Sequence, residues 1–430
     1  MTSTAPLDLT LPASDEEAAA AGLPRHPGDA LSSRQRLTYV LILGALTALG
    51  PFTMDTYLPS LPTLQSDFST TTSLVQLTLT ATTIGFGVGQ LLVGPWSDRV
   101  GRRLPLILAT SLHILACLGA ALAPNIEVLS VFRFLQGFGA AAGGVVSSAM
   151  IRDLFSGRPM VKMLANLALV NGLAPVIAPV LGSQLLLIMP WRGIFWVLAC
   201  YGAFVVICVS LWIMETRPKA VRAAQSAHTT FRSRYKAVLT DRIYIGIVLV
   251  GSMNFAGLFA YLSASTFLFQ DLYHFTPQQY GILFACNSVG IIIGVQTSGR
   301  IVHRVAPQWI LACSTSVMLA AAIAIALNSV LGLGEWGVMV PLWFFICACG
   351  FGFPNVGVLT MNSHPHEAGT AASLLGAFQF VLAGIVAPIV GIFPMHSGLP
   401  MGGIMVVTST LSVLGFWFVV RPRTVPDIGH

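Results

Sequence analysis

Charged residues are scarce in this 430-residue chain. Asp, Glu, Lys and Arg together make up 9% of it, whereas soluble domains average about 25%. Hydrophobic residues make up 55% of the chain. Such a composition cannot cover a water-exposed surface with polar groups, so it excludes an ordinary soluble domain.

Signatures of enzymes and of ATP-driven proteins are missing as well. No Gly directly precedes any of the three lysines, Lys162, Lys219 and Lys236, so the GxxxxGK[ST] phosphate loop is absent. His366-Glu367 is followed by Ala-Gly-Thr, which does not complete the HExxH zinc motif, and no GxSxG occurs. We therefore expect no enzyme, no ATP-dependent step and no cofactor.

Cysteine and histidine offer no metal site or disulfide framework. His364 and His366 are expected to lie in a loop and to bind no metal. The first 36 residues lack the basic start, apolar core and cleavage site of a signal peptide, so we interpret them as a disordered tail. The seven cysteines lie inside apolar stretches, as small core residues do: Cys117, Cys200, Cys208, Cys286, Cys313, Cys347 and Cys349.

Long apolar stretches, by contrast, are abundant. A helix of about 20 predominantly apolar residues spans a bilayer, and the chain contains twelve such stretches. They are Leu37–Leu61, Thr72–Trp96, Leu104–Ala123, Glu127–Met150, Met163–Met189, Gly193–Met214, Ile243–Phe269, Pro277–Ile301, Trp309–Val330, Trp336–Asn362, Ala368–Phe393 and Leu399–Val420. The sequence therefore predicts an all-α polytopic membrane protein with 12 transmembrane helices.

The net charge of +6 does not indicate a nucleic-acid partner, because Lys and Arg gather on one side of the predicted membrane. All of them except Arg133 and Arg192 lie in the two tails or in the loops on the same side as the tails. Loops rich in Lys and Arg remain in the cytoplasm. Both termini are therefore predicted to be cytoplasmic.

An internal repeat divides the chain in two. Three segments of the first half match segments of the second at a nearly constant offset. Tyr57-Leu58 matches Tyr261-Leu262 at an offset of 204 residues, and residues 178–182 match residues 387–391 at 209. At an offset of 205, Gly94, Asp98, Arg99 and Gly101 match Gly299, His303, Arg304 and Ala306. Repeated halves with the substrate site between them are typical of transporters. We expect six-helix bundles at 37–214 and 243–420, a cytoplasmic linker at 215–242, and tails at 1–36 and 421–430.

Four charges are concentrated in the stretch GPWSDRVGRR between the second and third apolar stretches. The notable residues are Gly94, Asp98, Arg99, Gly101, Arg102 and Arg103. Three arginines suffice to keep this loop in the cytoplasm. Topology requires neither the Asp nor the spacing of the glycines, which indicates a second role for the loop.

We interpret that second role as a latch between the two halves. Gly94 lets its helix approach a neighbour closely. Asp98 is expected to face the N-terminus of the eleventh helix near residues 368–370, where free N–H groups and the helix dipole attract an anion. Arg102 is expected to reach Asp153 at the end of the fourth helix.

Four motifs carry a resemblance to a known family. Residues 94–103 resemble the loop signature of the major facilitator superfamily, and residues 133–137 (RFLQG) resemble its helix 4 motif. Residues 174–182 (APVIAPVLG) resemble the helix 5 motif of its drug/proton antiporters. Residues 54–62 (MDTYLPSLP) are similar to the bicyclomycin/chloramphenicol-resistance branch, Bcr/CflA. The resemblance spans about residues 37–420 and implies two six-helix repeats.

The helix 5 motif contains Pro175, Pro179 and Gly182. The resemblance implies that its prolines bend the helix and hinder proton leak between the halves, although they could simply kink it. The second half departs from the first, with His303 in place of Asp98 and Ser263 in place of Pro59. A weaker second latch is therefore expected.

Only Asp55 and Arg133 carry charge well inside the apolar stretches. A charge at the bilayer centre costs roughly 2.5–3.5 kcal/mol on insertion scales, so such residues are candidates for function. At 1.5 Å per residue, both lie about 9 Å below the outer ends of their helices. A structural ion pair is one interpretation. The other, which the resemblance also implies, is proton coupling by Asp55 with Arg133 nearby.

Weaker patterns have simpler explanations. Residues 137–142 fit GxGxxA, but a dinucleotide site needs a preceding strand, so close helix packing is expected instead. Polar residues inside the stretches either line a substrate cavity or bond one helix to another. These are Tyr57, Asn171, Asn254, Tyr261, Asn287, Asn355 and Gln379.

The sequence thus favours a proton-coupled antiporter that exports small, fairly hydrophobic drugs similar to chloramphenicol or bicyclomycin. The alternative is a proton-coupled exporter of a physiological metabolite such as an amino acid or small peptide. With only two buried charges available, the composition favours drugs. Expected partners are the drug, protons and the lipid of a bacterial cytoplasmic membrane, with the protein acting as a monomer.

Overall fold

The computed structural model describes residues 28, 31–155, 157–217, 239–362, 368–393 and 397–425. In these ranges the chain forms helices joined by turns, without a β-strand. His364, His366, most of the predicted N-terminal tail and most of the predicted linker lie outside the described residues.

The first half of the chain contains six spans. Its elements are α2 (Ser33–Asp55), the 3₁₀ turn η2 (Leu58–Ser60), α3 (Leu61–Asp67), α4 (Thr72–Val100), α5 (Arg103–Ala121), α6 (Ile126–Leu154), α7 (Gly157–Ile188) and α8 (Trp191–Trp212). The first span comprises α2, η2 and α3 together. Most predicted boundaries differ from these by only a few residues.

The second half repeats this plan. Its elements are α11 (Arg242–Phe267), the π-helical turn η3 (Leu268–Leu272), α12 (Pro277–Ile301), α13 (Pro307–Leu331), α14 (Trp336–Asn362), α15 (Ala368–Ile392), α16 (Leu399–Leu414), the π-helical turn η5 (Gly415–Val420) and η6 (Pro422–Thr424). Among the described residues, twelve helices are long and apolar enough to cross a membrane. The predicted all-α, 12-span fold is therefore confirmed.

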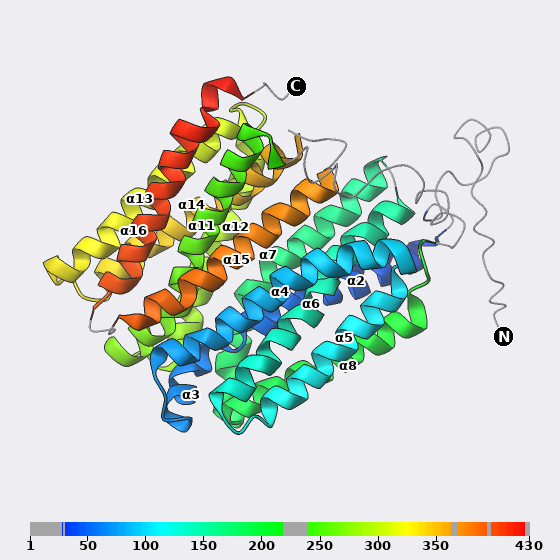
Figure 1. The fold of residues 1–430 in the computed structure, drawn as a ribbon, viewed down its shortest axis with the longest axis horizontal. Helices are drawn as coiled ribbons and strands as arrows, with labels where there is room; N and C mark the ends of the chain where they lie inside the picture. The colour runs from blue at the N-terminus through cyan, green and yellow to red at the C-terminus, as the bar shows by residue number, and fades with distance from the viewer. Residues whose placement is uncertain are drawn as a thin grey trace.

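Helices α2–α8 pack mainly on one another, and α11–α16 do the same. The two groups lie side by side in Figure 1, with α15 alongside α4 at their boundary. The largest contacts between the groups are α4 with α15 and α7 with α12. Each of these pairs joins the second helix of one half to the fifth helix of the other, which is the arrangement that an internal repeat produces.

Glycines allow α4 and α6 to pack at very short range. A Cβ atom on Gly137 would lie 2.0 Å from the carbonyl oxygen of Thr82, and one on Gly85 would lie 2.1 Å from that of Phe134. Gly94 faces α6 farther along the same interface. The close packing expected for residues 137–142 is therefore present, because any side chain at these positions would separate the two helices.

The first span is broken directly after Asp55. The sequence predicted one helix from Leu37 to Leu61, but α2 ends at Asp55 and a 3₁₀ turn begins at Leu58. Pro59 explains the break, because its nitrogen has no hydrogen to donate to the carbonyl oxygen four residues earlier. The predicted span is present, but the break inside it was not predicted, and it lies beside the predicted proton carrier.

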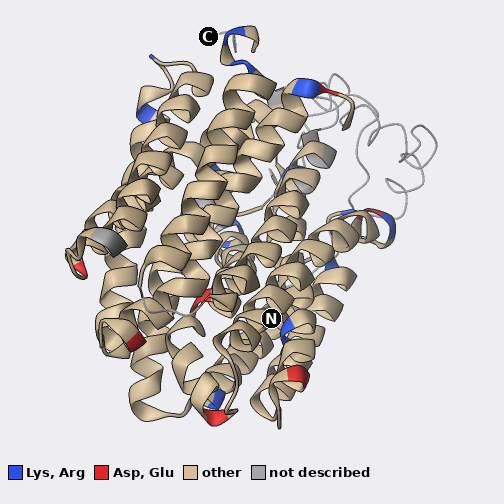
Figure 2. Cartoon of the chain, turned by 60° about the vertical axis from the view of Figure 1, so that its left-hand side comes forward, with Lys and Arg blue, Asp and Glu red and all other residues tan. Residues whose placement is uncertain are grey.

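The bundle has two ends, which we name by their sequence. The motif end contains residues 98–103, together with the start of α2 and the end of α16. The far end contains the connections that follow α3, α5, α7, α11, α13 and α15. Charged residues are sparse along the middle of the helices and lie mainly toward the two ends in Figure 2. Such a distribution suits a protein whose middle crosses the hydrocarbon core.

Candidate transport cavity and its charged residues

A cavity of about 700 Å³ lies between the two halves. Its wall includes residues of α2, α4, α6 and α7 from the first half and of α11, α12, α14 and α15 from the second. Arg152 and Met361, which line it near the ends of α6 and α14, are exposed, whereas Asp55 and Tyr261 at its other limit are buried. The cavity therefore reaches the motif end and is closed toward the far end.

Aromatic side chains make up much of the wall. They are Phe86, Phe255, Phe259, Phe284, Phe353 and Phe380. Phe86 and Phe380 meet across the two halves with ring centroids 4.8 Å apart, and Phe255 lies 5.2 Å from Phe380. This aromatic wall was missed from the sequence, because 25 Phe residues are spread over the chain and nothing in the sequence separates these six from the others.

Among the described residues of the cavity wall, Asp55 is the one acid. Its side chain is 7% exposed, and no described residue forms a hydrogen bond or ion pair with its carboxylate. The phenol groups of Tyr261 and Tyr280 are near enough for its charge to act on them. An ionised carboxylate without a partner is costly in such surroundings, and binding a proton removes that cost.

Arg133 lies elsewhere in the first half. Its Nη1 atom donates to the carbonyl oxygen of Thr53 at 3.0 Å and to Oε1 of Gln136 at 2.6 Å. Its guanidinium carbon lies 4.5 Å from the ring centroid of Tyr57 and 5.7 Å from that of Phe195. Fully buried, it makes cation–π contacts in place of a carboxylate pair.

The ion pair between Asp55 and Arg133, which the sequence left open, is therefore not formed in the described residues. Equal depth in the membrane does not fix which face of a helix a side chain occupies. Asp55 lines the cavity, whereas Arg133 points into the packed interior of its own half, where a chain of polar groups continues through Gln136 and Cys117 to His113.

Four of the seven predicted cavity residues line the cavity: Asn171, Tyr261, Asn287 and Gln379. Asn287 donates to the hydroxyl of Tyr261 at 3.2 Å, which orients both groups. Gln90, which the sequence did not single out, also lines the wall and lies against Gly376 of α15. The binding of substrate by the four predicted residues stays a prediction.

The other three predicted cavity residues lie outside the cavity wall. Asn254 accepts a hydrogen bond from Ser412 at 2.7 Å, and Asn355 donates to Ser298 at 2.8 Å, so both join neighbouring helices. The hydroxyl of Tyr57 lies 2.9 Å from that of Thr78. Tyr57 follows the end of α2, and its ring packs under the guanidinium of Arg133 inside the first half, away from the cavity wall.

The loop motif forms an ion-pair cluster at the motif end. Asp98 pairs with Arg102 at 2.6 Å and with Arg217 at 2.5 Å, and Arg102 also donates to Asp153 at 2.8 Å. The expected contact between Arg102 and Asp153 is thus present, and Arg99 is exposed at the end of α4. The described partners of Asp98 are Arg102 of its own loop and Arg217 at the start of the predicted linker, so its docking on α15 stays a prediction.

Gly101 is required by the backbone of this loop. Its φ of +103° lies in a region that side chains disfavour, and a Cβ there would lie 2.5 Å from Oε2 of Glu215. The Glu215 carboxylate accepts from the N–H of Arg102 at 2.8 Å and of Arg103 at 3.1 Å, at the N-terminus of α5. The guanidinium of Arg103 donates to the carbonyl of Ser210. Glu215 was not predicted as part of the motif.

The helix 5 motif, residues 174–182, lies on α7. Pro175 lines the cavity, and a Cβ on Gly281 of α12 would lie 3.5 Å from the carbonyl oxygen of Pro179. A Cβ on Gly182 would lie 2.0 Å from the carbonyl oxygen of Thr56. Gly182 therefore allows α7 to pack directly on the break that follows Asp55.

Among the described residues, no group of three or more His, Cys, Asp or Glu comes together in a way that could bind a metal ion. The seven cysteines are free thiols. The arrangement is suited to binding an uncharged or weakly polar molecule between aromatic walls, next to one carboxylate.

Curated relatives match nearly the whole chain. It is 36% identical to an "Uncharacterized MFS-type transporter YdgK" of Bacillus subtilis over 91% of this chain and 98% of the relative. It is 29% identical to a "Bicyclomycin resistance protein homolog" of Haemophilus influenzae over 90% of this chain and 97% of the relative. It is 27% identical to a "Multidrug resistance protein D" of Escherichia coli over 89% of this chain and 95% of the relative.

Solved structures share the fold. A partially occluded inward-open structure of the xylose transporter XylE from E. coli has a TM-score of 0.72 at 14% identity, covering 93% of this chain and 100% of that one. An inward-facing structure of a bacterial homologue of the human lysosomal transporter Spinster has a TM-score of 0.71 at 15% identity. The match covers 92% of this chain and 98% of that one.

The family profile of the Major Facilitator Superfamily matches residues 41–388. This match confirms the predicted superfamily, the relatives named for drug resistance agree with the predicted likeness to Bcr/CflA, and the twelve spans agree with the predicted multi-pass location in the inner membrane. Members of this family are transporters of small molecules, not enzymes. The chain belongs to the Major Facilitator Superfamily.

Proposed function

We propose that this chain exports small, predominantly hydrophobic drugs from the cytoplasm in exchange for protons. The observation that carries the proposal is a cavity of about 700 Å³ whose described wall is aromatic and contains one carboxylate, that of Asp55. Pockets of roughly 300–1,000 Å³ enclose drug-sized molecules. Two relatives are named for resistance to bicyclomycin and to multiple drugs, which supports the same class of substrate.

The proposed coupling residue is Asp55. Its carboxylate faces the same cavity as the drug, so one group can bind either a proton or the polar part of a substrate. Arg133 acts on Asp55 indirectly in this scheme, because it binds the carbonyl of Thr53 and packs on Tyr57, on the two sides of the break. The proton gradient drives export without ATP or another cofactor.

The proposed orientation places the motif end in the cytoplasm. Of the basic residues in the described ranges, Arg192 is the one at the far end, and positive loops remain inside. The cavity then faces the cytoplasm, ready to take up substrate. In the opposite state, Asp98 would exchange its contact with Arg217 for the N-terminus of α15 and join the halves at this end. One chain supplies both halves, so a monomer suffices.

A resistance panel in a host deficient in efflux tests this proposal. Expression should raise the inhibitory concentration of hydrophobic antibiotics such as chloramphenicol, and an uncoupler should abolish the effect. Resistance that survives the uncoupler, or a panel without any protected drug, would contradict it. Uncoupler-sensitive export of an amino acid or small peptide in place of drugs would support the alternative of a metabolite exporter.

A further inference from the structure

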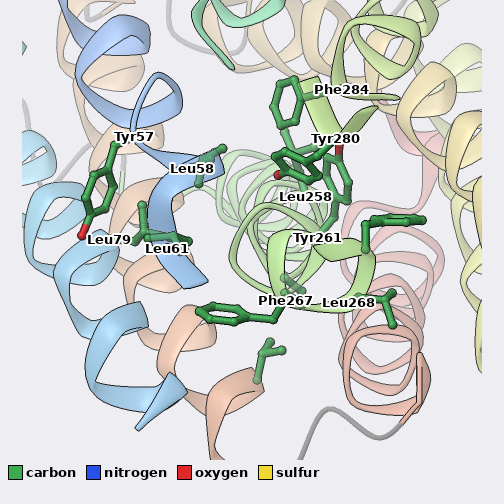
Figure 3. Packing of buried hydrophobic residues seen from close by; sticks show 14 of the residues in the cluster. Tyr57, Leu58, Leu61, Leu79, Leu258, Tyr261, Phe267, Leu268, Tyr280 and Phe284 are labelled. Atoms are coloured by element: carbon green, nitrogen blue, oxygen red, sulfur yellow. The ribbon is translucent and has the colours of Figure 1, made fainter. Parts of the chain in front are cut away.

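The far end of the bundle is closed by an apolar seal that includes both halves. One continuous cluster of buried side chains contains Leu58 and Leu61 of the first half and Leu258, Phe267 and Leu268 of the second. Figure 3 shows Leu58 and Leu61 on η2–α3 and, facing that segment, α11 with Leu258 and Phe267. An apolar seal of this kind closes the cavity but lacks directional bonds, so it does not by itself fix one arrangement of the halves.

Three side-chain amides cross this seal. In each case the Nε2 atom of a glutamine donates to a backbone carbonyl oxygen of the other half. The pairs are Gln76 to Ser263 at 2.9 Å, Gln270 to Pro59 at 3.1 Å, and Gln278 to Ser183 at 3.0 Å. One glutamine comes from the first half and two come from the second, so the bonds run in both directions.

Two of these bonds lie where glycines bring the halves together. A Cβ on Gly391 of α15 would lie 2.2 Å from Oε1 of Gln76 and 2.9 Å from the Cα of Ser73. A Cβ on Gly281 of α12 would lie 2.6 Å from Oγ of Ser183. The Gln278 bond therefore lies within the α7–α12 contact, whereas Gln76 lies against Gly391 of α15 and donates to Ser263 of the neighbouring helix α11.

The third bond ends close to the coupling residue. Gln270 lies in the π-helical turn η3, and its acceptor, Pro59, lies in η2 four residues after Asp55. A change at Asp55 that moves η2 would therefore alter this bond directly. Gly182, packed on the carbonyl of Thr56, lies one residue from Ser183, which accepts the bond of Gln278.

We propose that Gln76, Gln270 and Gln278 form a clasp that keeps the cavity closed at the far end and breaks when the cavity opens there. This role rests on the proposed transport function, with a cavity that opens alternately at the motif end and at the far end. Each bond is neutral and modest in net strength. The clasp can therefore break without separating buried charges, which would cost far more. The glutamines are positioning residues, because they set the state of the protein and do not touch substrate.

Two cysteine reporters test the clasp in the full chain, with the exposed cysteines 200, 286 and 313 and the half-buried Cys347 changed to Ser. Ala264→Cys, fully buried and next to Ser263, the acceptor of Gln76, reports opening at the far end, and Met361→Cys, in the cavity wall at the motif end, reports opening on the opposite side. A membrane-impermeant maleimide is applied separately from each side of oriented vesicles.

Each single change of a clasp glutamine to Leu should raise labelling of Ala264→Cys roughly fivefold, which corresponds to about 1 kcal/mol. The triple variant should raise it on the order of a hundredfold if the three bonds are independent. Labelling of Met361→Cys should fall at the same time. A protein that is merely destabilised would instead expose both reporters.

Gln279→Leu is the matched control. Gln279 is adjacent to Gln278, but its amide caps α12 through Thr276 within its own half, so its loss should leave the labelling ratio unchanged. Unchanged labelling in the triple variant, or a rise at both reporters, would overturn the clasp. If labelling rises at Ala264→Cys and falls at Met361→Cys in a protein that exports no drug, the clasp is supported and the proposed drug export is wrong.

Discussion

The guanidinium of Arg133 donates to the carbonyl oxygen of Thr53, two residues before Asp55. The same guanidinium lies over the ring of Tyr57, two residues after it. Arg133 therefore contacts the chain on both sides of Asp55 without pairing with its carboxylate. Its position favours a role in fixing the geometry of the break, rather than in neutralising the acid.

Arg133→Lys is expected to lower proton-coupled transport to a small fraction of the wild-type rate. A lysine ammonium is a compact charge on a flexible stem, and it does not reproduce the flat guanidinium that stacks on Tyr57 while binding Thr53 and Gln136. Drug-driven proton flux in proteoliposomes measures the effect.

Arg192→Lys is the matched control for this change. Arg192 also stacks on an aromatic ring, that of Trp191, but it lies at the far end and is partly exposed. It should tolerate lysine with little loss of transport. Wild-type coupling in Arg133→Lys would show that the planar group at position 133 is dispensable.

Asp98→Asn is expected to reduce transport strongly while insertion and orientation stay normal. The arginines that orient the loop are retained, but the amide loses the ion pairs with Arg102 and Arg217 and the charge proposed to bind the N-terminus of α15. Accessibility labelling of the loop measures orientation, and drug uptake into inverted vesicles measures transport. Normal transport, or an inverted topology, would refute the latch.

Gly137→Ala is expected to destabilise the first half. The new methyl group would lie 2.0 Å from the carbonyl oxygen of Thr82, so α4 and α6 must separate. Overpacking of this kind costs typically 1–3 kcal/mol. The midpoint of thermal unfolding in detergent should therefore fall by several degrees. Gly403→Ala, where a Cβ meets nothing within 4 Å, should leave it almost unchanged, and equal midpoints for both variants would contradict the packing described above.

Composition and motifs sufficed to predict the twelve spans and the family. They also located the contact between Arg102 and Asp153, because both residues lie at the ends of apolar stretches that meet on one side of the membrane. Depth along a helix can be counted from the sequence. The face that a residue occupies depends on how neighbouring helices pack, which is why Asp55 and Arg133 shared a predicted depth but are not paired.

The aromatic wall and the clasp were not predictable for a related reason. Phe is common on lipid-facing and buried surfaces alike, and Phe86 becomes part of the wall only because α15 places Phe380 opposite it. Gln76 carries no charge and belongs to no motif, and its acceptor is a backbone carbonyl 187 residues away. Every residue has a backbone carbonyl, so the side chain at position 263 does not indicate that its carbonyl accepts this bond.

Asp55→Asn tests proton coupling most directly. An amide keeps the shape of the carboxylate but cannot ionise, so the variant should lose uphill export of a neutral drug and the accompanying proton flux, while binding and downhill exchange survive. The energy is sufficient, because one charge crossing 100 mV supplies about 2.3 kcal/mol and thus supports roughly a 50-fold drug gradient.

The decisive measurement uses proteoliposomes with an imposed proton gradient, a neutral drug and a fluorescent pH reporter inside. The wild-type protein should concentrate the drug while protons move the opposite way, and Asp55→Asn should do neither. If the Asn variant still concentrates the drug with protons moving in the opposite direction, Asp55 is not the proton carrier and the proposed coupling is wrong.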